Sequence, residues 1–181
     1  TCYLRIGDHN VIREFVTINT ATNDGDATVI GHHNLIMAYC HIAHKCTIGN
    51  HVIMSNLATL AGDVLIEDHA VLGGMAGIHQ FCRIGTMAMV GACTKIVQDV
   101  VPYTIADGNP AAPVGLNLVK MRRMELDADT TAAIKEAYRL IYRQQLKAAE
   151  AVARIRTELA QNAAAQHMAE FVAASTRGIV R

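Results

Sequence analysis

Residues 30–54 read IGHHNLIMAYCHIAHKCTIGNHVIM and place an aliphatic residue at every sixth position. The period extends beyond this stretch, because twelve successive positions of the series are aliphatic: Ile30, Ile36, Ile42, Ile48, Met54, Leu60, Ile66, Leu72, Ile78, Ile84, Val90 and Ile96. An amphipathic helix has a period of about 3.6 residues and a half-buried strand a period of two, so neither produces this series. A six-residue period predicts an all-β left-handed parallel β-helix, in which each hexapeptide is one short strand and one corner.

The other positions of the repeat fit the same fold. The residue four positions after each aliphatic residue is mostly small, as at Cys40, Ala58, Ala76 and Thr94. Glycine often follows the aliphatic residue and tolerates unusual corner backbone. Three hexapeptides close one triangular coil of 18 residues around the aliphatic side chains, and successive coils stack about 4.8 Å apart. Residues 18 apart in the sequence should therefore lie directly above one another.

The repeat begins at the N-terminus and is interrupted once. Ile6, Ile12 and Ile18 keep its phase, and residues 19–28, NTATNDGDAT, then interrupt it with turn-forming residues. We expect a loop at 19–28 that replaces one hexapeptide, so that Ile18 and Ile42 share a face. The chain begins without Met and inside the repeat, so we expect further coils to precede it.

A second, helical part follows the repeat. Prolines end the hexapeptide pattern, at Pro102, Pro110 and Pro113. We therefore divide the chain into a β-helix at 1–105 and an α-helical C-terminal domain at 106–181. Helices are predicted where apolar residues recur at helical spacing, at 127–145, 148–161 and 167–175. The first of these carries a stripe formed by Ile134, Tyr138, Ile141 and Tyr142.

Composition excludes several classes of function. Sixteen basic residues balance sixteen acidic ones, so no net charge attracts nucleic acid or an anionic membrane surface. No apolar run approaches the roughly 20 residues that span a bilayer, and the N-terminus has no signal-peptide layout. We expect a cytoplasmic protein without a transmembrane segment and without a nucleic-acid partner.

The five cysteines do not suggest a reactive centre. They form no C-x-x-C pair, and their odd number argues against a disulfide framework. Cys40, Cys46 and Cys82 occupy the small inward position of the repeat, where a thiol is buried and unreactive. We expect all five to be reduced packing residues, so a general base acting directly is a simpler mechanism than covalent catalysis.

The 18-residue stacking gathers polar residues along one edge of the prism: Asn19, His41, His44, Asp63, His79 and Gln80. Imidazoles titrate near neutrality and a carboxylate can orient them, so the cluster suits proton transfer. The alternative is that corner residues simply face solvent. We expect the remaining histidines to be surface residues, among them His32, His33, His51, His69 and His167.

A zinc site is a further alternative, because the γ-class carbonic anhydrases carry zinc on a prism of this kind. Such a site needs three histidines that converge on one ion. His41 and His44 are three residues apart, whereas His79 lies two coils farther along, about 10 Å away. This separation disfavours zinc, and no metal is predicted.

Several strings carry a resemblance to a known family: HIAHKCTIGN (41–50), LGGMAGIHQFCRIG (72–85), VQDVVPYTIADGNPA (97–111) and STRGIVR (175–181). Over essentially the whole chain, the sequence resembles the acyl-carrier-protein–UDP-N-acetylglucosamine O-acyltransferases of lipid A biosynthesis. The resemblance implies transfer of a 3-hydroxyacyl chain from acyl carrier protein to the C3 position of the UDP-sugar, without a cofactor. It also implies a homotrimer with active sites in clefts between adjacent β-helices.

The resemblance also assigns roles to individual residues. His44 matches the general base, and the backbone N–H of Gly62 matches the donor to the thioester oxyanion. The positions that match substrate-binding residues are Asn19, His41, Asp63, His79, Gln80, Asn117 and Arg123. Met89 and Ala92 match the region that closes the acyl groove, where Ala92 suggests a medium chain.

Four positions depart from the family pattern. Asn19 and Asp63 stand where well-studied members have histidine, Lys45 follows the base where Asp is usual, and Val119 replaces a carboxylate that contacts the nucleotide. These departures leave oxygen or nitrogen open as the acceptor atom at the sugar C3. Two alternatives therefore remain: a related N-acyltransferase acting on a 3-amino UDP-sugar or an acylated glucosamine, and a non-catalytic trimeric scaffold.

Overall fold

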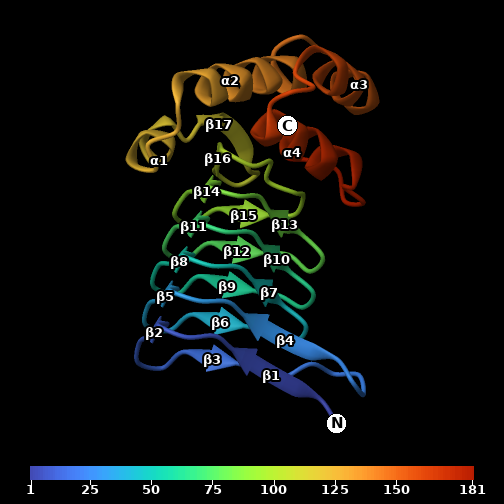
Figure 1. Cartoon of the computed structure of the whole chain (residues 1–181). Coiled ribbons are helices and arrows are strands. Elements are labelled where there is room, and N and C mark those ends of the chain that lie inside the picture. Colours follow the sequence, from blue (N-terminus) through green and yellow to red (C-terminus); the bar gives the residue numbers. More distant parts are fainter.

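The structure, a computed structural model of residues 1–181, is a parallel β-helix with α-helices at its C-terminal end (Figure 1). The predicted fold class is confirmed. The strands of the prism are β1 (Tyr3–Ile6), β2 (Val11–Ile12), β3 (Thr17–Ile18), β4 (Ala27–Ile30), β5 (Leu35–Ile36), β6 (His41–Ile42), β7 (Thr47–Ile48), β8 (Ile53–Met54), β9 (Thr59–Leu60), β10 (Leu65–Ile66), β11 (Val71–Leu72), β12 (Gly77–Ile78), β13 (Arg83–Ile84), β14 (Met89–Val90) and β15 (Lys95–Ile96).

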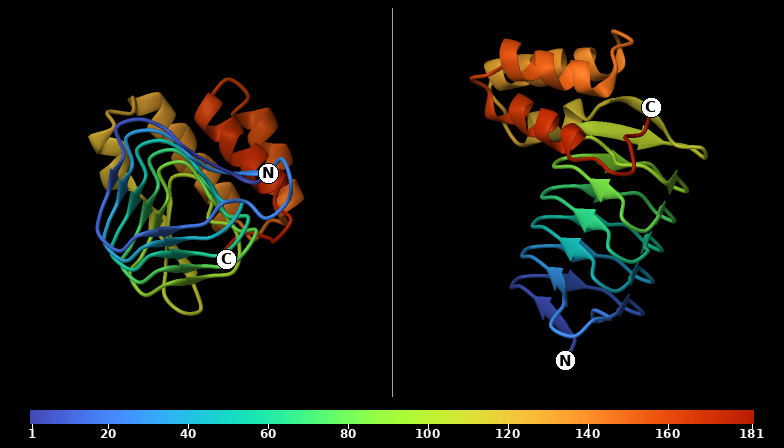
Figure 2. Two further views of the ribbon diagram at one scale, coloured as in Figure 1. Left: turned by 90° about the horizontal axis from the view of Figure 1, so that it is seen from below. Right: turned by 90° about the vertical axis from the view of Figure 1, so that its right-hand side faces the viewer.

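Every third strand belongs to the same face, which gives the coil its triangular section (Figure 2). Face A contains β1, β4, β7, β10 and β13; face B contains β2, β5, β8, β11 and β14; face C contains β3, β6, β9, β12 and β15. All pairs between these strands are parallel, and from β4 onward their register follows the expected spacing of 18 residues, as in His41 opposite Thr59. The stacking rule used to group the polar residues therefore holds.

The interruption near the N-terminus is a loop between β3 and β4. Ile18 pairs with Ile42 across a coil of 24 residues, as predicted. The loop turns at Gly25, whose φ of +83° is in the left-handed region. The loop ends earlier than expected, because Ala27 and Thr28 already belong to β4. This strand pairs with β1 over four residues.

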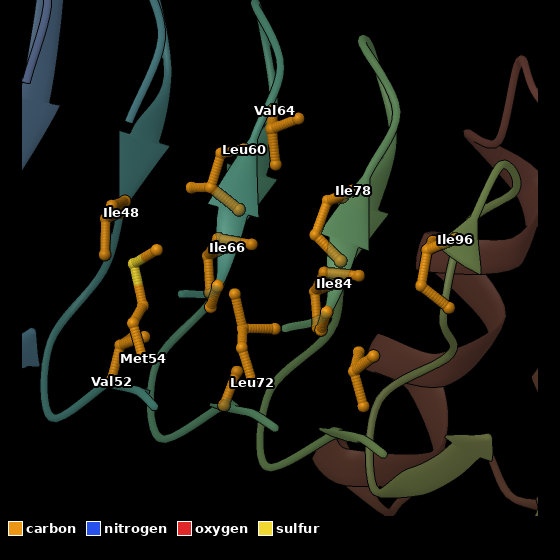
Figure 3. Close-up of a cluster of buried hydrophobic side chains, with 14 of the residues drawn as sticks. Ile48, Val52, Met54, Leu60, Val64, Ile66, Leu72, Ile78, Ile84 and Ile96 are labelled. Atoms are coloured by element: carbon orange, nitrogen blue, oxygen red, sulfur yellow. The ribbon is translucent and has the colours of Figure 1, made fainter. Parts of the chain in front are cut away.

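The aliphatic residue of each hexapeptide fills the interior of the prism (Figure 3). Residues such as Ile42, Leu60 and Ile66 have no exposed surface, and burial of one such side chain contributes about 1.5–3 kcal/mol. In the first coil, by contrast, Ile6 and Ile12 are exposed at the end of the prism. Each coil therefore depends on the coils stacked against it for its stability.

The corners are built differently from the expectation. Their left-handed residue is almost never glycine but a larger residue, such as Lys45 or Asp63 (φ +59° each). The repeated glycines are required for another reason. A Cβ added at Gly31 would lie 2.5 Å from the carbonyl oxygen of Gly49 in the next coil. Glycine is required there by the close approach of stacked coils rather than by its φ.

Each corner has its own chemistry. The corner between faces A and B carries parallel imidazoles about one coil apart, with centroids of His33 and His51 separated by 4.9 Å. The corner between faces B and C is apolar and exposed, with Phe15 stacked on Tyr39. The corner between faces C and A is where His44 lies, next to Lys45.

Strand pairing continues beyond the hexapeptides. β16 (Thr104–Asp107) pairs with β14, and β17 (Ala112–Leu116) pairs antiparallel with β16. The division into domains at 105/106 therefore stays a prediction. The helices are α1 (Leu118–Arg123), α2 (Ala128–Tyr142), α3 (Ala148–Glu158) and α4 (Ala163–Ala173).

The helices agree with the sequence except in two places. In α2 the stripe of Ile134, Tyr138 and Ile141 is buried, and Asp127 accepts a hydrogen bond from the backbone N–H of Thr130 as the N-cap. The helix α4 begins four residues earlier than predicted, and α1 was not predicted because six residues are too few for a clear period. None of the helices is both long and apolar enough to cross a bilayer.

Side chains of α4 dock on face A of the prism. The ring of His167 lies 2.8 Å from a carboxylate oxygen of Glu67, and Arg83 stacks on the ring of Phe171 at 3.9 Å. His167, expected to be a surface residue, is partly exposed and is held against Glu67. The sequence could not show this contact, because Glu67 and His167 belong to different parts of the chain.

Candidate active site

His44 lies on the corner between faces C and A, directly over Gly62 of the next coil. A Cβ added at Gly62 would come within 2.6 Å of the Nε2 atom of His44, so the ring occupies the space that a side chain there would need. Although 42% of the side chain is exposed, Nδ1 itself is buried and makes no hydrogen bond. The ring therefore turns Nδ1 inward and leaves its other nitrogen, Nε2, as the one that a substrate can reach.

Asp63 is the acidic neighbour of His44, as the stacking predicted. Its Oδ2 lies 3.7 Å from Nδ1 of His44, which is longer than a hydrogen bond but aimed at the unpaired nitrogen. Its Oδ1 lies 3.6 Å from the ammonium of Lys45. One carboxylate thus faces both the imidazole and the lysine that follows it.

Lys45 has a second acidic partner in the N-terminal loop. Its ammonium lies 3.1 Å from Asp26, and this hydrogen bond raises the pKa of Lys45 and lowers the pKa of Asp26. Both side chains are partly exposed, so the pair contributes little to stability. Its consequence is positional, because the Lys45 ammonium lies between Asp26 and Asp63.

The backbone of Gly62 offers a free donor next to His44. Its carbonyl oxygen accepts a hydrogen bond from Phe81, whereas its N–H donates none within the chain. A free N–H beside a basic nitrogen is the arrangement that can hold an oxyanion during acyl transfer. The role assigned to Gly62 nevertheless stays a prediction.

The remaining predicted residues of this edge lie on face C. Nδ1 of His41 is 2.7 Å from the hydroxyl of Thr17, which fixes the ring, whereas His79 and Gln80 are exposed. Asn19 lies one coil below Ala43, because its backbone N–H bonds to Ile42 of that coil. The structure thus brings Asn19, His41, His44, Asp63, His79 and Gln80 to one face and its edge.

A trough of about 320 Å³ runs along face C beside His44. Its lining is His41, Ala43, Thr59, Leu60, Ala61, Gly77, Ile78, His79, Lys95 and Ile96. Sequence reasoning identified the two histidines but missed Gly77 and Lys95. The 18-residue rule could have found them, because both stand in register above His41 and Thr59.

Asn117 and Arg123 lie away from this edge. The amide of Asn117 donates to the carbonyl oxygen of Met87, which places it at the corner between faces A and B, and its Oδ1 caps α1 by accepting from Lys120. Arg123 is exposed in the last turn of α1, on the same side. One chain therefore does not bring these two residues to His44.

Met89 and Ala92 do not line the trough either. Met89 belongs to β14 on face B, and Ala92 lies in the turn between β14 and β15. Both are at the level of the last coils. Their assignment as the stop of the acyl groove stays a prediction.

Four of the five cysteines are at least partly buried, Cys2 among them. Cys40, Cys46 and Cys82 are fully buried, and burial raises the pKa of the Cys46 and Cys82 thiols to about 11. These thiols stay protonated and unreactive. Cys93, however, is exposed, so the expectation that all five cysteines are packing residues is wrong. No three His, Cys, Asp or Glu side chains are arranged to hold a metal ion.

Two family models match this chain. The model described as UDP N-acetylglucosamine O-acyltransferase, domain 2, matches residues 99–180. The model of the bacterial transferase hexapeptide, with six repeats, matches residues 27–62. The first covers the end of the prism and the helices, and the second covers the coils that contain His44.

Individual relatives extend the match over nearly the whole chain. Two proteins named acyl-(acyl-carrier-protein)–UDP-N-acetylglucosamine O-acyltransferase, from Thiobacillus denitrificans and Burkholderia lata, are 46% and 48% identical to it; each alignment covers 98% of this chain and 69% and 70% of the respective relative. A solved structure of UDP-N-acetylglucosamine O-acyltransferase from Moraxella catarrhalis superposes with a TM-score of 0.95 at 41% identity. That alignment covers all of this chain and 71% of the other.

Proposed function

The chain belongs to the family of acyl-(acyl-carrier-protein)–UDP-N-acetylglucosamine O-acyltransferases, and on this premise we propose that it acylates the glucosamine C3 position of UDP-N-acetylglucosamine. The donor is a 3-hydroxyacyl chain carried by acyl carrier protein, and the reaction is the first step of lipid A biosynthesis. The step needs no cofactor, and we place it in the cytoplasm.

The proposed mechanism is direct transfer with His44 as general base. Nε2 takes the proton of the sugar 3-hydroxyl while the oxygen of that hydroxyl attacks the thioester carbonyl carbon. The Gly62 N–H stabilises the oxyanion, a contribution worth about 3–4 kcal/mol of barrier in comparable enzymes. The C–S bond then breaks, and the imidazolium of His44 returns the proton to the sulfur of the carrier.

The orientation of the His44 ring is the observation that carries this proposal. Its Nδ1 is buried and faces Asp63, so the tautomer with the proton on Nδ1 leaves Nε2 unprotonated on the accessible side. The distance of 3.7 Å to Asp63 does not argue against this role, because catalytic hydrogen bonds are often long until substrate binds. A histidine that only faced solvent at a corner would not need a buried nitrogen without a hydrogen-bond partner.

The positions of the two residues expected to bind the nucleotide support an assembly of several copies of the chain. Asn117 and Arg123 lie at the corner between faces A and B, whereas His44 lies at the corner between faces C and A. We propose that one cleft combines His44 of one copy with Arg123 of the next, as in a homotrimer. Arg123 would then bind the diphosphate, for which a guanidinium is suited.

The test is a transfer assay with the purified protein, 3-hydroxyacyl carrier protein, and UDP-N-acetylglucosamine or its 3-amino analogue in parallel reactions. Mass spectrometry of the product identifies the acceptor atom, and we expect an ester with the 3-hydroxyl sugar. Transfer only to the 3-amino sugar would favour the N-acyltransferase alternative. Transfer to neither would support the non-catalytic scaffold.

A further inference from the structure

The carboxylate of Asp63 has two competing neighbours at the candidate active site. Its Oδ2 lies 3.7 Å from Nδ1 of His44, and its Oδ1 lies 3.6 Å from the ammonium of Lys45. Both distances exceed the length of a hydrogen bond, which is about 2.7–3.2 Å. Neither neighbour has captured the carboxylate, so its position depends on how strongly each of them attracts it.

The stacking of coils causes this competition. Lys45 and Asp63 are 18 residues apart, and both are left-handed corner residues with φ of +59°. The backbone N–H of Asp63 donates to the carbonyl oxygen of His44 at 3.0 Å, which fixes one corner against the next. An ammonium attracts a carboxylate more strongly than the N–H of a neutral imidazole does, because both partners are charged. A Lys45 with no other partner would therefore draw Asp63 away from His44.

Asp26, at the end of the N-terminal loop, is the other partner of Lys45. Its carboxylate lies 3.1 Å from the ammonium, which is within hydrogen-bond distance and closer than the carboxylate of Asp63. The hydrogen bond raises the pKa of Lys45 and lowers the pKa of Asp26, so both groups are charged near neutral pH. Lys45 is thus shared between two carboxylates, and Asp26 holds it more closely.

The loop presents Asp26 in a fixed position. The side-chain amide of Asn23 donates to the Asp26 carboxylate at 3.2 Å, and the backbone N–H of Tyr3 donates to the Asp26 carbonyl oxygen at 2.9 Å. On the corner, the backbone N–H of Lys45 donates to the hydroxyl of Thr28, which is fully buried. Both sides of the ion pair are therefore anchored, unlike a chance contact between two mobile surface side chains.

We propose that Asp26 is a positioning residue for the general base. It holds the ammonium of Lys45, so that Asp63 stays free to accept a hydrogen bond from Nδ1–H of the base. This inference rests on the proposed acyl transfer, in which Nε2 of His44 must be unprotonated to take the proton of the sugar. The loop that interrupts the hexapeptide repeat thereby contributes to the catalytic edge.

The test is a double-mutant cycle of Asp26→Asn and Lys45→Met, assayed for acyl transfer. Asp26→Asn frees the ammonium to close on Asp63, so kcat should fall about tenfold while KM changes little. The double variant also removes the competing ammonium, so its kcat should return to within about threefold of the wild type. Methionine fits the left-handed corner, because Met75 and Met87 adopt this backbone at other corners.

A matched control and the rescue exclude a purely structural role of the loop. The control is Asp24→Asn, since Asp24 is an aspartate of the same loop whose side chain is 86% exposed. If Asp26→Asn only loosened the loop, removal of the Lys45 ammonium would not restore kcat. An unchanged kcat in Asp26→Asn, or a loss that Lys45→Met does not rescue, overturns the inference.

Nuclear magnetic resonance separates this inference from the proposed function, because it needs no turnover. The nitrogen chemical shifts of the neutral His44 ring, identified by their loss in His44→Ala, report which nitrogen carries the proton. We expect Nδ1–H in the wild type, a shift toward Nε2–H in Asp26→Asn and recovery in the double variant. This pattern in a protein that transfers no acyl chain supports the role of Asp26 and refutes the transferase. Normal transfer with the same tautomer and the same kcat in all variants overturns the role of Asp26 and leaves the transferase intact.

Discussion

At the scale of single residues, the reaction depends on the His44 ring. Replacing it with alanine removes the only basic nitrogen that lies over Gly62, so His44→Ala should lower kcat by about 10²–10⁴. The matched control is His51→Ala, because His51 is an exposed histidine on a different corner. Acyl transfer is followed by mass spectrometry, and an unchanged kcat in His44→Ala would leave the mechanism without a base.

A substitution at Gly62 tests whether the reaction depends on the position of the His44 ring. In Gly62→Ala the new Cβ would approach Nε2 of His44 to 2.6 Å, so the ring must move away from the free N–H. We expect kcat to fall about 100-fold while the melting temperature changes little. Gly74→Ala is the control, since its Cβ would lie 3.4 Å from the Asn56 carbonyl oxygen. Equal kcat in both variants would contradict the proposed geometry.

The sequence predicted only part of this site. The proximity of His44 and Asp63 follows from the stacking of coils, because a fixed period turns sequence separation into position. The contact between Lys45 and Asp26 does not, because Asp26 belongs to the loop that breaks the period. The buried state of Nδ1 depends on the rotation of one side chain, which no sequence pattern records.

At the scale of elements, the ion pair of His167 and Glu67 anchors α4 to the prism. The hydrogen bond that His167 donates to the carboxylate of Glu67 raises the pKa of His167. Burial opposes ionisation of Glu67, but hydrogen bonds from His167 and Thr86 outweigh it and lower the pKa of that carboxyl. The stability from His167 is therefore complete below its unfolded pKa of about 6.5 and is lost as pH rises through the higher folded pKa.

His167→Gln should thus destabilise the protein more at pH 5.5 than at pH 8.5. Because 37% of the His167 side chain is exposed, the difference should be about 1 kcal/mol. Urea unfolding at the two pH values measures it, with His51→Gln as the control. A penalty for His167→Gln that is the same at both pH values would show that the charge of the imidazole does not hold α4.

The start of α4 offers a second element to test. Asn162 is its N-cap, and Oδ1 accepts a hydrogen bond from the backbone N–H of Ala165 at 3.0 Å. Asn162→Ala should cost about 1 kcal/mol, which lowers the melting temperature by about 2–4 °C. Gln161→Ala, at the exposed neighbouring position, should have almost no effect. Equal melting temperatures of the two variants would exclude the cap as a source of stability.

At the scale of the whole molecule, the fold was predictable because one period governs nearly a hundred residues. Twelve aliphatic positions in phase leave few alternatives, and the observed register follows them. The helical part has no such repeat, so the start of α4 and the existence of α1 were missed. Contacts between the two parts, such as Arg83 with Phe171, depend on how α4 is placed and could not be predicted.

His44 and Arg123 lie at different corners of the prism, and this separation leads to a prediction about assembly. If each cleft combines His44 of one copy with Arg123 of the next, then His44→Ala and Arg123→Ala are each inactive alone but complement each other in mixed trimers. Every mixed trimer then contains one cleft with both residues intact, and random mixing in equal amounts should restore about a quarter of wild-type activity. The two variants are denatured together, refolded and assayed against each refolded alone. If both residues served the same cleft from a single chain, no mixed trimer would contain an intact cleft, and activity would stay at the level of the separate variants.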